Sequence, residues 1–530
     1  MTDEKEDGKF VYTEGTMDEK VEFIFDRMKE SSFLGDCRNK LKSELKRQLN
    51  NMDDDEEDFH VNLTYMMQRL GLVHAIKTFV MDIHTEGTKD KRDFGKQNAI
   101  LVAMEPERRE LLDALETARK AWEKMTTDAL REYARAAPAR NASLPLVIVH
   151  ELPKDPEHKP DVASRFLFSS NDLLAALQRI SPLNRSPHVH AHPWSSIQPL
   201  LHTRETSEMQ QRYTELSPAH AQYGLDEDVP NVHGDYVYIA GKNRLGDKVL
   251  HNGTVPTARQ YAKTGCPINI RPHIWRQALS VAIDPVYFQQ LEAKVRGYTF
   301  VTDGLFLFDV QQTTDSSDYF PFEDHLRSVM LAFSRDAQVP SQAVVTLQHP
   351  IVANEMTIPP ANVMPCSGLV MFVSPLCYLY DDPVHVYFVF REMYCRYWCQ
   401  LAGISSRSNS ILALCKTFET LIHRHIPVVV QHLLHHSIVP LSIAFPWIQS
   451  GFSGVLEIDQ VLLLWDRVVG YDSLEIIAIF AAALFTFRSE ELLLVTKTED
   501  AKDLFAEALE IQVMPILQQF LFPIYDTTAA

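Results

Sequence analysis

Residues 462–485 read LLLWDRVVGYDSLEIIAIFAAALF, and this stretch sets the fold class of the chain. From Leu474 to Phe485 nearly every residue is apolar, so a helix built from them has no face for water. Such a helix either lies in a sizeable core or crosses a membrane. A bilayer needs about 20 apolar residues, and this run is shorter and contains Glu475. It therefore predicts a core helix.

Two polar pairs interrupt the same stretch. Asp466 stands next to Arg467, and we expect an internal hydrogen-bonded pair because a carboxylate beside apolar surface needs a partner. Asp472 precedes Glu475 by three positions, which is the spacing of a capping box. In that motif the two side chains bind backbone N–H groups that the first helical turn leaves unpaired. The spacing predicts that the apolar helix begins beside Asp472.

The composition limits the class of partner. The chain has 530 residues, a formal net charge of -19 and a pI near 5.5. An acidic surface disfavours nucleic acid and anionic lipid as main partners, because both bind basic surfaces. The charged N-terminal residues lack the apolar region of a signal peptide, and the seven cysteines stand mostly in apolar surroundings. We expect a cytoplasmic protein with reduced thiols and without direct insertion into a membrane.

Residues 1–230 are predicted to form a partly helical N-terminal region with acidic and Pro/Ser/His-rich loops. The clearest helix covers 106–137, where apolar residues recur every three or four positions. It packs onto its own domain or docks on a partner, and the sequence does not separate these two. The acidic run 53–58 predicts a solvated loop, and residues 235–240 (DYVYIA) predict a short strand.

Three alternating histidines, His188, His190 and His192, form a metal-like pattern. On a strand their rings would share one face, a geometry that can bind zinc. Prolines at 187 and 193 favour a loop, and no cluster of carboxylates or cysteines stands nearby. The sequence therefore predicts no metal site.

From residue 261 the chain is rich in Leu, Phe, Trp and Ala, and it predicts an all-α domain at 260–525. The predicted helical segments are 274–283, 322–334, 368–380, 384–401, 411–425, 428–436, 458–469, 474–487 and 504–520. No repeat of fixed period occurs, which disfavours a solenoid.

Several spaced motifs in this domain stand in the order of a known family. They are Gly265-Cys266-Pro267, Arg271 and Trp275 at its start, QHLLHHSIVPLSIAFP at 431–446, WIQSGFSG from Trp447, and the stretch around Trp465 and Asp466. Together they resemble the TBC domain over about 265–522. The resemblance implies an all-α bundle in which these tryptophans, Arg271 and Asp466 are structural. It also implies a Rab-type small GTPase as partner and a role in vesicle trafficking.

The resemblance implies a GTPase-activating protein that supplies an Arg and a Gln to its partner. The Arg places positive charge against the γ-phosphoryl oxygens, and the Gln orients the attacking water. Such an Arg is worth about 10³–10⁵ in rate. GTP and Mg²⁺ would belong to the partner GTPase, so the chain itself is expected to need no cofactor.

Both of these positions are substituted in this chain. The run FLFDVQQT at 306–313 fits the Arg frame, with Gln312 where the Arg belongs. The run PCSGL at 365–369 fits the Gln frame, with Ser367 in place of the Gln. Gln312 is neutral and cannot offset developing charge, and Ser367 is too short to reach a water unless the backbone moves closer. The sequence favours weak or absent acceleration of GTP hydrolysis.

Other groups could replace the missing side chains. Arg327 stands three residues after Asp324 on an amphipathic helix, and Arg335 ends that helix, where a cation meets the negative end of the helix dipole. Residues 337–364 form a longer loop than the family usually has, and long loops beside a site are often functional. The Gln could also come from the GTPase itself.

Three functional hypotheses follow. The chain is a GTPase-activating protein with atypical catalytic residues, a non-catalytic GTPase-binding module, or a scaffold whose N-terminal half does the work. The sequence names neither the GTPase nor the membrane, and it leaves the role of the N-terminal half open.

Overall fold

A computed structural model describes residues 25–29, 32–48, 67, 72, 76, 97–136, 147–148, 166–178, 203–225, 234–345, 359–405, 407, 409–506 and 511–523. The acidic run 53–58, the histidines at 188, 190 and 192, and residues 346–358 of the loop 337–364 lie outside these residues. Contacts divide the chain into two compact units, Met1–Glu107 and Arg108–Ala530. The predicted domain boundary between 230 and 260 stays a prediction.

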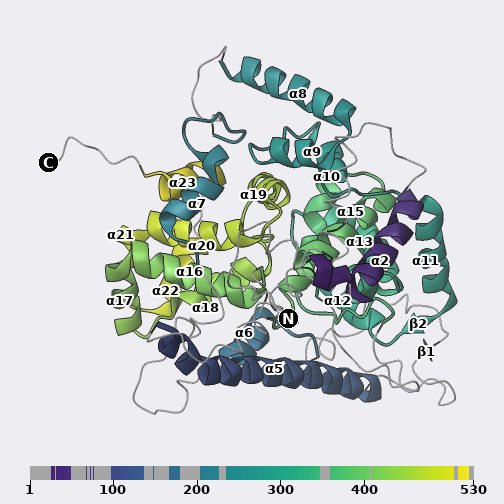
Figure 1. Cartoon of the computed structure of the whole chain (residues 1–530), viewed down its shortest axis with the longest axis horizontal. Helices are drawn as coiled ribbons and strands as arrows, with labels where there is room; N and C mark the ends of the chain where they lie inside the picture. The colour runs from purple at the N-terminus through teal and green to yellow at the C-terminus, as the bar shows by residue number, and fades with distance from the viewer. Residues whose placement is uncertain are drawn as a thin grey trace, which may run out of the picture. The chain divides into compact units, whose positions relative to one another are not determined.

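Helices dominate the described residues, and the predicted all-α class is confirmed (Figure 1). The α-helices are α2 (Ser32–Gln48), α5 (Gln97–Ala136), α6 (Ser170–Gln178), α7 (Thr206–Arg212), α8 (Gly234–Asn252), α9 (Val255–Ala262), α10 (Arg271–Ala278), α11 (Pro285–Gly297), α12 (Asp303–Thr314), α13 (Glu323–Ser334), α14 (Val339–Gln342), α15 (Pro383–Arg396), α16 (Ile411–His425), α17 (Pro427–His435), α18 (Pro440–Gln449), α19 (Ile458–Tyr471), α20 (Glu475–Phe487), α21 (Ser489–Leu492), α22 (Thr498–Ala506) and α23 (Val513–Leu521). Short 3-10 helices are η4 (Thr214–Leu216), η5 (Phe320–Phe322), η6 (Val370–Phe372), η7 (Ser374–Tyr378) and η8 (Trp398–Gln400).

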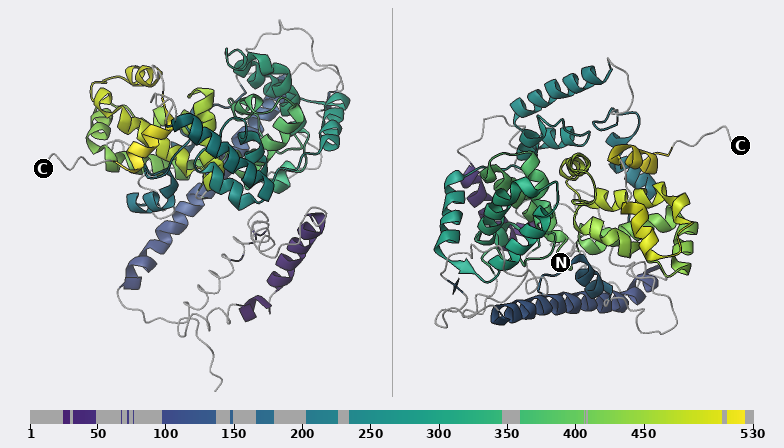
Figure 2. Two further views of the ribbon diagram at one scale, coloured as in Figure 1. Left: turned by 90° about the horizontal axis from the view of Figure 1, so that it is seen from above. Right: turned by 180° about the vertical axis from the view of Figure 1, so that it is seen from behind.

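Two neighbouring groups of helices make up most of the second unit, α10 to α15 and α16 to α23 (Figures 1 and 2). Strand β1 (Val147–Ile148) pairs antiparallel with β2 (Thr299–Phe300) at the side of the first group. Among the described residues, no one helix is long and apolar enough to cross a membrane, and α17 with α18 passes that test only as a pair bent by 110°.

The predicted strand at 235–240 is wrong, because these residues begin helix α8. Along α8, Lys242, Gly246 and Val249 are buried, and this spacing of four and three is helical. A Cβ on Gly246 would lie 2.9 Å from the Ile270 side chain and from Tyr261 Oη. The close packing of α8 on α9 and α10 therefore outweighs the strand preference of a short aromatic run.

Helix α20 is the predicted core helix, and every residue from Glu475 to Phe485 is buried. It packs against α16, α18, α19 and α23. The predicted capping box is wrong: Leu474 precedes the helix without a side-chain cap, and Asp472 instead ends α19 in the left-handed conformation (φ 49°). The Asp472 carboxylate accepts hydrogen bonds from Tyr397 Oη at 2.7 Å and Arg259 Nη1 at 3.0 Å. These tertiary donors compete with the local N–H groups and hold the side chain away from α20.

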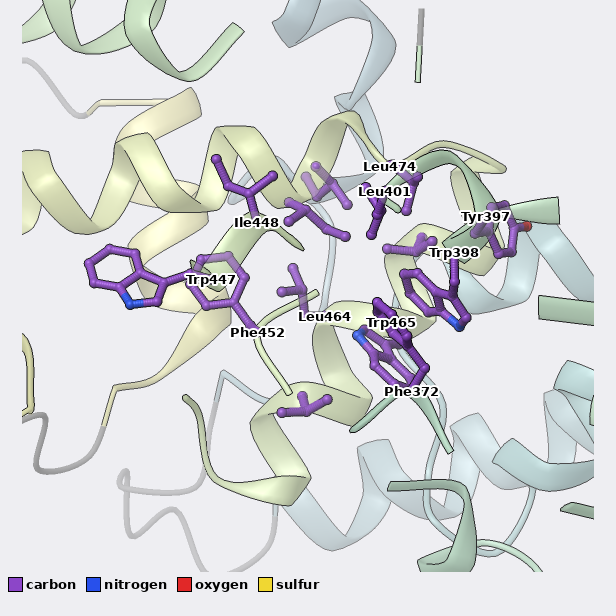
Figure 3. Packing of buried hydrophobic residues seen from close by; sticks show 14 of the residues in the cluster. Phe372, Tyr397, Trp398, Leu401, Trp447, Ile448, Phe452, Leu464, Trp465 and Leu474 are labelled. Carbon is purple, nitrogen blue, oxygen red and sulfur yellow. The ribbon is translucent and has the colours of Figure 1, made fainter. Parts of the chain in front are cut away.

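Tryptophans join η8 to α19 at the centre of the core (Figure 3). The Trp398 ring lies 4.8 Å from both Trp465 and Phe372, centroid to centroid. Trp465 Nε1 also donates to the Gly451 carbonyl at 2.8 Å, so its polar edge is satisfied inside the core. Trp447 packs against Phe485 and Phe505. These aromatic contacts hold together the helices that carry Trp447 and Trp465.

The long helix predicted at 106–137 is α5, and its residues after 107 pack onto their own unit. Leu115 and Trp122 belong to the same buried cluster as the helices α9 to α23. Helix α6 contributes Leu173, Leu174 and Leu177 to that cluster and packs against α18. Segments N-terminal to the predicted domain are therefore part of its core.

Candidate functional site

Helix α12 carries Gln312, the position that the sequence predicts for the Arg of the family. Leu305, Phe306 and Val310 are buried in the core, while Gln311 and Gln312 near the end of the helix are exposed. The helix thus presents an uncharged amide to solvent. Its next turn ends at Thr313 and Thr314, whose hydroxyls donate to backbone carbonyls one turn earlier.

Asp309 ties α12 to the loop that carries Ser367. Its buried carboxylate accepts the backbone N–H of Gly368 at 2.7 Å and that of Val370 at 2.8 Å. Burial raises the pKa of Asp309 to about 6, and this desolvation outweighs the two N–H donors, which favour the charged form. One carboxylate therefore joins the two elements that carry Gln312 and Ser367.

Ser367 itself is half-buried, and its main chain has a partner that sequence reasoning missed. The Ser367 N–H donates to the Phe168 carbonyl at 2.7 Å, and Phe168 forms a parallel bridge with Cys366. Phe168 packs against Trp122 of α5, with 5.4 Å between ring centroids. The signal in the sequence was the apolar run at 166–168, which interrupts a stretch rich in Pro, Ser and His.

Arg335, one of the two alternative arginines, is fully buried. Its Nη1 and Nη2 both bind the Asp303 carboxylate, the second at 2.6 Å, and Nη2 also donates to the Tyr298 carbonyl at 2.9 Å. The guanidinium lies 4.7 Å from the centroid of the Phe300 ring. These contacts hold Arg335 between α12 and β2, where it stabilises the fold.

Arg327, the other alternative, lies half-buried on α13, which packs against α12. Within the described part of the chain its guanidinium forms no ion pair with an acidic side chain. Its neighbour Ser328 donates to Glu292 of α11 at 3.2 Å. Arg327 is thus the alternative arginine whose charge is not already compensated by the surrounding described residues.

The Arg and Trp at the start of the predicted domain converge on Asp466. The fully buried carboxylate accepts from Arg271 Nε and Nη2 at 3.1 Å, Trp275 Nε1 at 2.8 Å and the Cys266 N–H at 2.9 Å. Arg467 lies 4.0 Å away and donates instead to the carbonyls of Leu463 and Tyr223. Asp466 therefore connects α10 to α19 through these hydrogen bonds. Its main ion-pair partner is Arg271 and not Arg467, its neighbour in the sequence.

No group of three or more His, Cys, Asp or Glu side chains that could hold a metal ion occurs in the described ranges. Beside the Ser367 loop lies a cavity of about 60 Å³, lined among others by Trp122, Phe168, Pro365 and Cys366. Its walls are mostly apolar. The site thus consists of an exposed amide, a half-buried serine and a carboxylate that holds their elements together.

Residues 362–493 match the family model of the Rab-GTPase-TBC domain, and this match confirms the predicted resemblance over that stretch. Among curated proteins it is similar to TBC1 domain family member 19 of Homo sapiens, with 37% identity over 342 residues. That match covers 62% of this chain and 64% of the relative, so the chain spans less than two thirds of the relative's length.

Two solved structures are also similar to this chain. The Chlamydomonas flagellar RabGAP TBC domain has 14% identity and a TM-score of 0.38, with 60% of this chain and 92% of that one covered. The Ypt/Rab-GAP domain of Gyp1p has 12% identity and a TM-score of 0.40, with 53% and 96% covered.

Proposed function

We propose that this chain regulates a Rab-type small GTPase by binding it through the TBC domain, on the face where Gln312 and the Ser367 loop lie. The family match supports the class of partner. Asp309 supports the location, because it fixes both elements in one rigid arrangement. The nucleotide and Mg²⁺ belong to the GTPase.

The observation that supports binding without accelerated hydrolysis is the exposed, uncharged Gln312 on α12. An amide there cannot offset the charge that develops on the γ-phosphoryl group. Ser367 is short and its N–H already binds Phe168, and Arg335 is buried against Asp303. The proposed activity is therefore binding of the GTP-loaded partner without the usual acceleration of hydrolysis.

A second candidate is an activating protein in which Arg327 acts as the Arg. The specific observation in its favour is that the Arg327 charge meets no acidic side chain in the described ranges. A guanidinium that is not held by a carboxylate can turn toward a bound phosphate. Helix α13 packs against α12, so Arg327 and Gln312 lie on neighbouring helices.

The proposal includes residence in the cytoplasm and contact with endomembranes only through the GTPase. A net charge of -19 disfavours direct binding to anionic lipid.

Single-turnover GTP hydrolysis with a panel of Rab-type GTPases separates the two candidates. Saturating full-length chain is expected to bind a GTP-loaded member and to change its hydrolysis rate by less than about twofold, against the 10³–10⁵ of an Arg in trans. If the wild-type chain accelerates hydrolysis and Arg327→Ala abolishes this, the second candidate is correct. Arg327→Lys is the matched control, since it keeps the charge but loses the planar donor.

A further inference from the structure

The Ser367 loop (residues 364–370) is held by a part of the chain that lies far before the TBC domain. We call this part the brace: residues 115–133 of α5 together with 166–178. The Phe168 carbonyl accepts the Ser367 N–H at 2.7 Å, and Phe168 pairs with Cys366 as in a parallel sheet. The brace thus binds the main chain of the position that replaces the family's Gln.

Side chains of the brace contact α12 as well. Leu130 and Leu167 form a buried cluster with Leu305 of α12, and Phe166, Phe308 and Met364 pack on it. A Cβ on Gly304 would lie 2.6 Å from Tyr133 Oη, so α5 and α12 approach each other closely there. The brace therefore touches both elements that Asp309 joins.

The other end of the brace is anchored in the core. Leu173, Leu174 and Leu177 of α6 are buried, and α6 packs against α18 in the second group of helices. Ser169 caps α6 together with Asp172, whose carboxylate accepts the Ser169 N–H at 2.8 Å. Elements with this much buried apolar surface open only with large parts of the fold. The brace is a permanent wall of the site, not a lid.

From these contacts we infer that the brace positions the Ser367 loop for contact with the partner, and that Phe168 is its positioning residue. The inference rests on the proposed function, since the partner is the small GTPase. Three groups then set the loop: the Asp309 carboxylate from α12, the Phe168 carbonyl from the brace, and the apolar contacts of Trp122 and Phe168 beside Cys366. A loop fixed before binding loses less conformational entropy when the partner docks.

Amide hydrogen exchange in the full chain tests the brace without any partner. In Phe168→Ala the amides of 366–370 are expected to exchange about tenfold faster than in wild type, because the ring that fixes the brace strand on Trp122 is gone. Phe168→Tyr keeps the ring and should retain wild-type exchange. Leu433→Ala, a buried residue of α17 in the other helix group, is the control for general destabilisation. Equal exchange in Phe168→Ala and wild type, or an equal increase in Leu433→Ala, overturns the inference.

Binding to the GTPase identified in the hydrolysis panel gives the second readout. Phe168→Ala is expected to weaken the affinity about tenfold, while Phe168→Tyr and Leu433→Ala stay within about twofold of wild type. If wild type binds no GTPase, the proposed function fails and the exchange result still decides on the brace. If wild type binds and Phe168→Ala binds equally well, the positioning role fails and the proposed function stands. Should Phe168→Ala not fold, Trp122→Phe replaces it, with the same direction and a smaller effect expected in both readouts.

Discussion

A single carboxylate, Asp309, connects the helix that carries Gln312 to the loop that carries Ser367. It is buried on α12 and binds the N–H groups of Gly368 and Val370, next to Ser367. The elements that carry Gln312 and Ser367 are therefore held together, although Gln312 is uncharged and Ser367 is short. At this scale, single substitutions can therefore change the chemistry of Gln312 and Ser367 without moving the elements that carry them.

Gln312→Arg combined with Ser367→Gln is expected to create activity in the GTPase that the wild-type chain binds. The Arg would place charge at the γ-phosphoryl group, and single-turnover hydrolysis should rise by at least about 10² relative to wild type, toward the 10³–10⁵ of an Arg in trans. Gln311→Arg, one position earlier on the same exposed surface, is the matched control and should stay inactive. A double variant that binds but does not accelerate contradicts the assignment of the frame.

The raised pKa of Asp309 predicts a pH-dependent stability. Its folded pKa of about 6 lies above the ordinary 3.8, so the stabilising contribution of the protonated form is present below pH 3.8 and is lost as pH rises through 6. Asp309→Asn does not titrate. Between these pH values, wild type should therefore lose roughly 3 kcal/mol of unfolding free energy relative to the variant. Urea denaturation of both proteins across this range measures the difference, and parallel pH profiles would argue against a raised pKa.

Arg335 is predicted to be structural. Arg335→Gln leaves Asp303 buried without its cation, and breaking such a pair costs roughly 3–5 kcal/mol of unfolding free energy. The double variant Asp303→Asn with Arg335→Gln removes both charges and should recover part of that loss. Chemical denaturation checks both. If Arg335→Gln unfolds like wild type, the buried pair does not support the fold.

At the scale of elements, the sequence predicted the apolar helix α20 and most helices of the domain, because their apolar periods are long. It missed how α20 begins, since Asp472 is held by Tyr397 and Arg259 from distant elements. It also predicted one helix at 368–380, where η6 and η7 form instead and Pro375 stands at the start of the second. Local sequence patterns do not predict hydrogen-bond partners that come from distant segments, such as those of Asp472.

The packing of α19 on α9 gives an element-scale prediction. A Cβ on Gly470 would lie 2.6 Å from the backbone nitrogen of Lys263, so Gly470→Ala forces the two helices apart. The variant should lose about 1–3 kcal/mol of unfolding free energy, as overpacked sites do. Gly297→Ala at the end of α11 meets no atom within 4 Å and should be neutral or slightly stabilising. Thermal or urea unfolding of the pair is the check, and equal stability of the two variants would contradict the close approach.

At the scale of the whole molecule, the spaced motifs of the sequence predicted the resemblance to the TBC domain, which the family match at 362–493 confirms, while Gln312 and Ser367 stay predicted site positions. The sequence did not place the N-terminal half. The contact of Phe168 with Ser367 joins segments almost two hundred residues apart. A backbone carbonyl makes this contact, and because every residue has one, the sequence does not indicate it. Glu475 also binds distant residues, Arg204 and Tyr213, which precede the predicted domain. The brace and these contacts make the preceding segments part of the domain's core.

The most direct test of the central claim is single-turnover GTP hydrolysis by the GTP-loaded Rab-type GTPase that the full-length chain binds. The account predicts saturable binding with a hydrolysis rate within about twofold of the GTPase alone, since Gln312 stands where the resemblance predicts the Arg. Acceleration by about 10³ or more with the wild-type chain would contradict it.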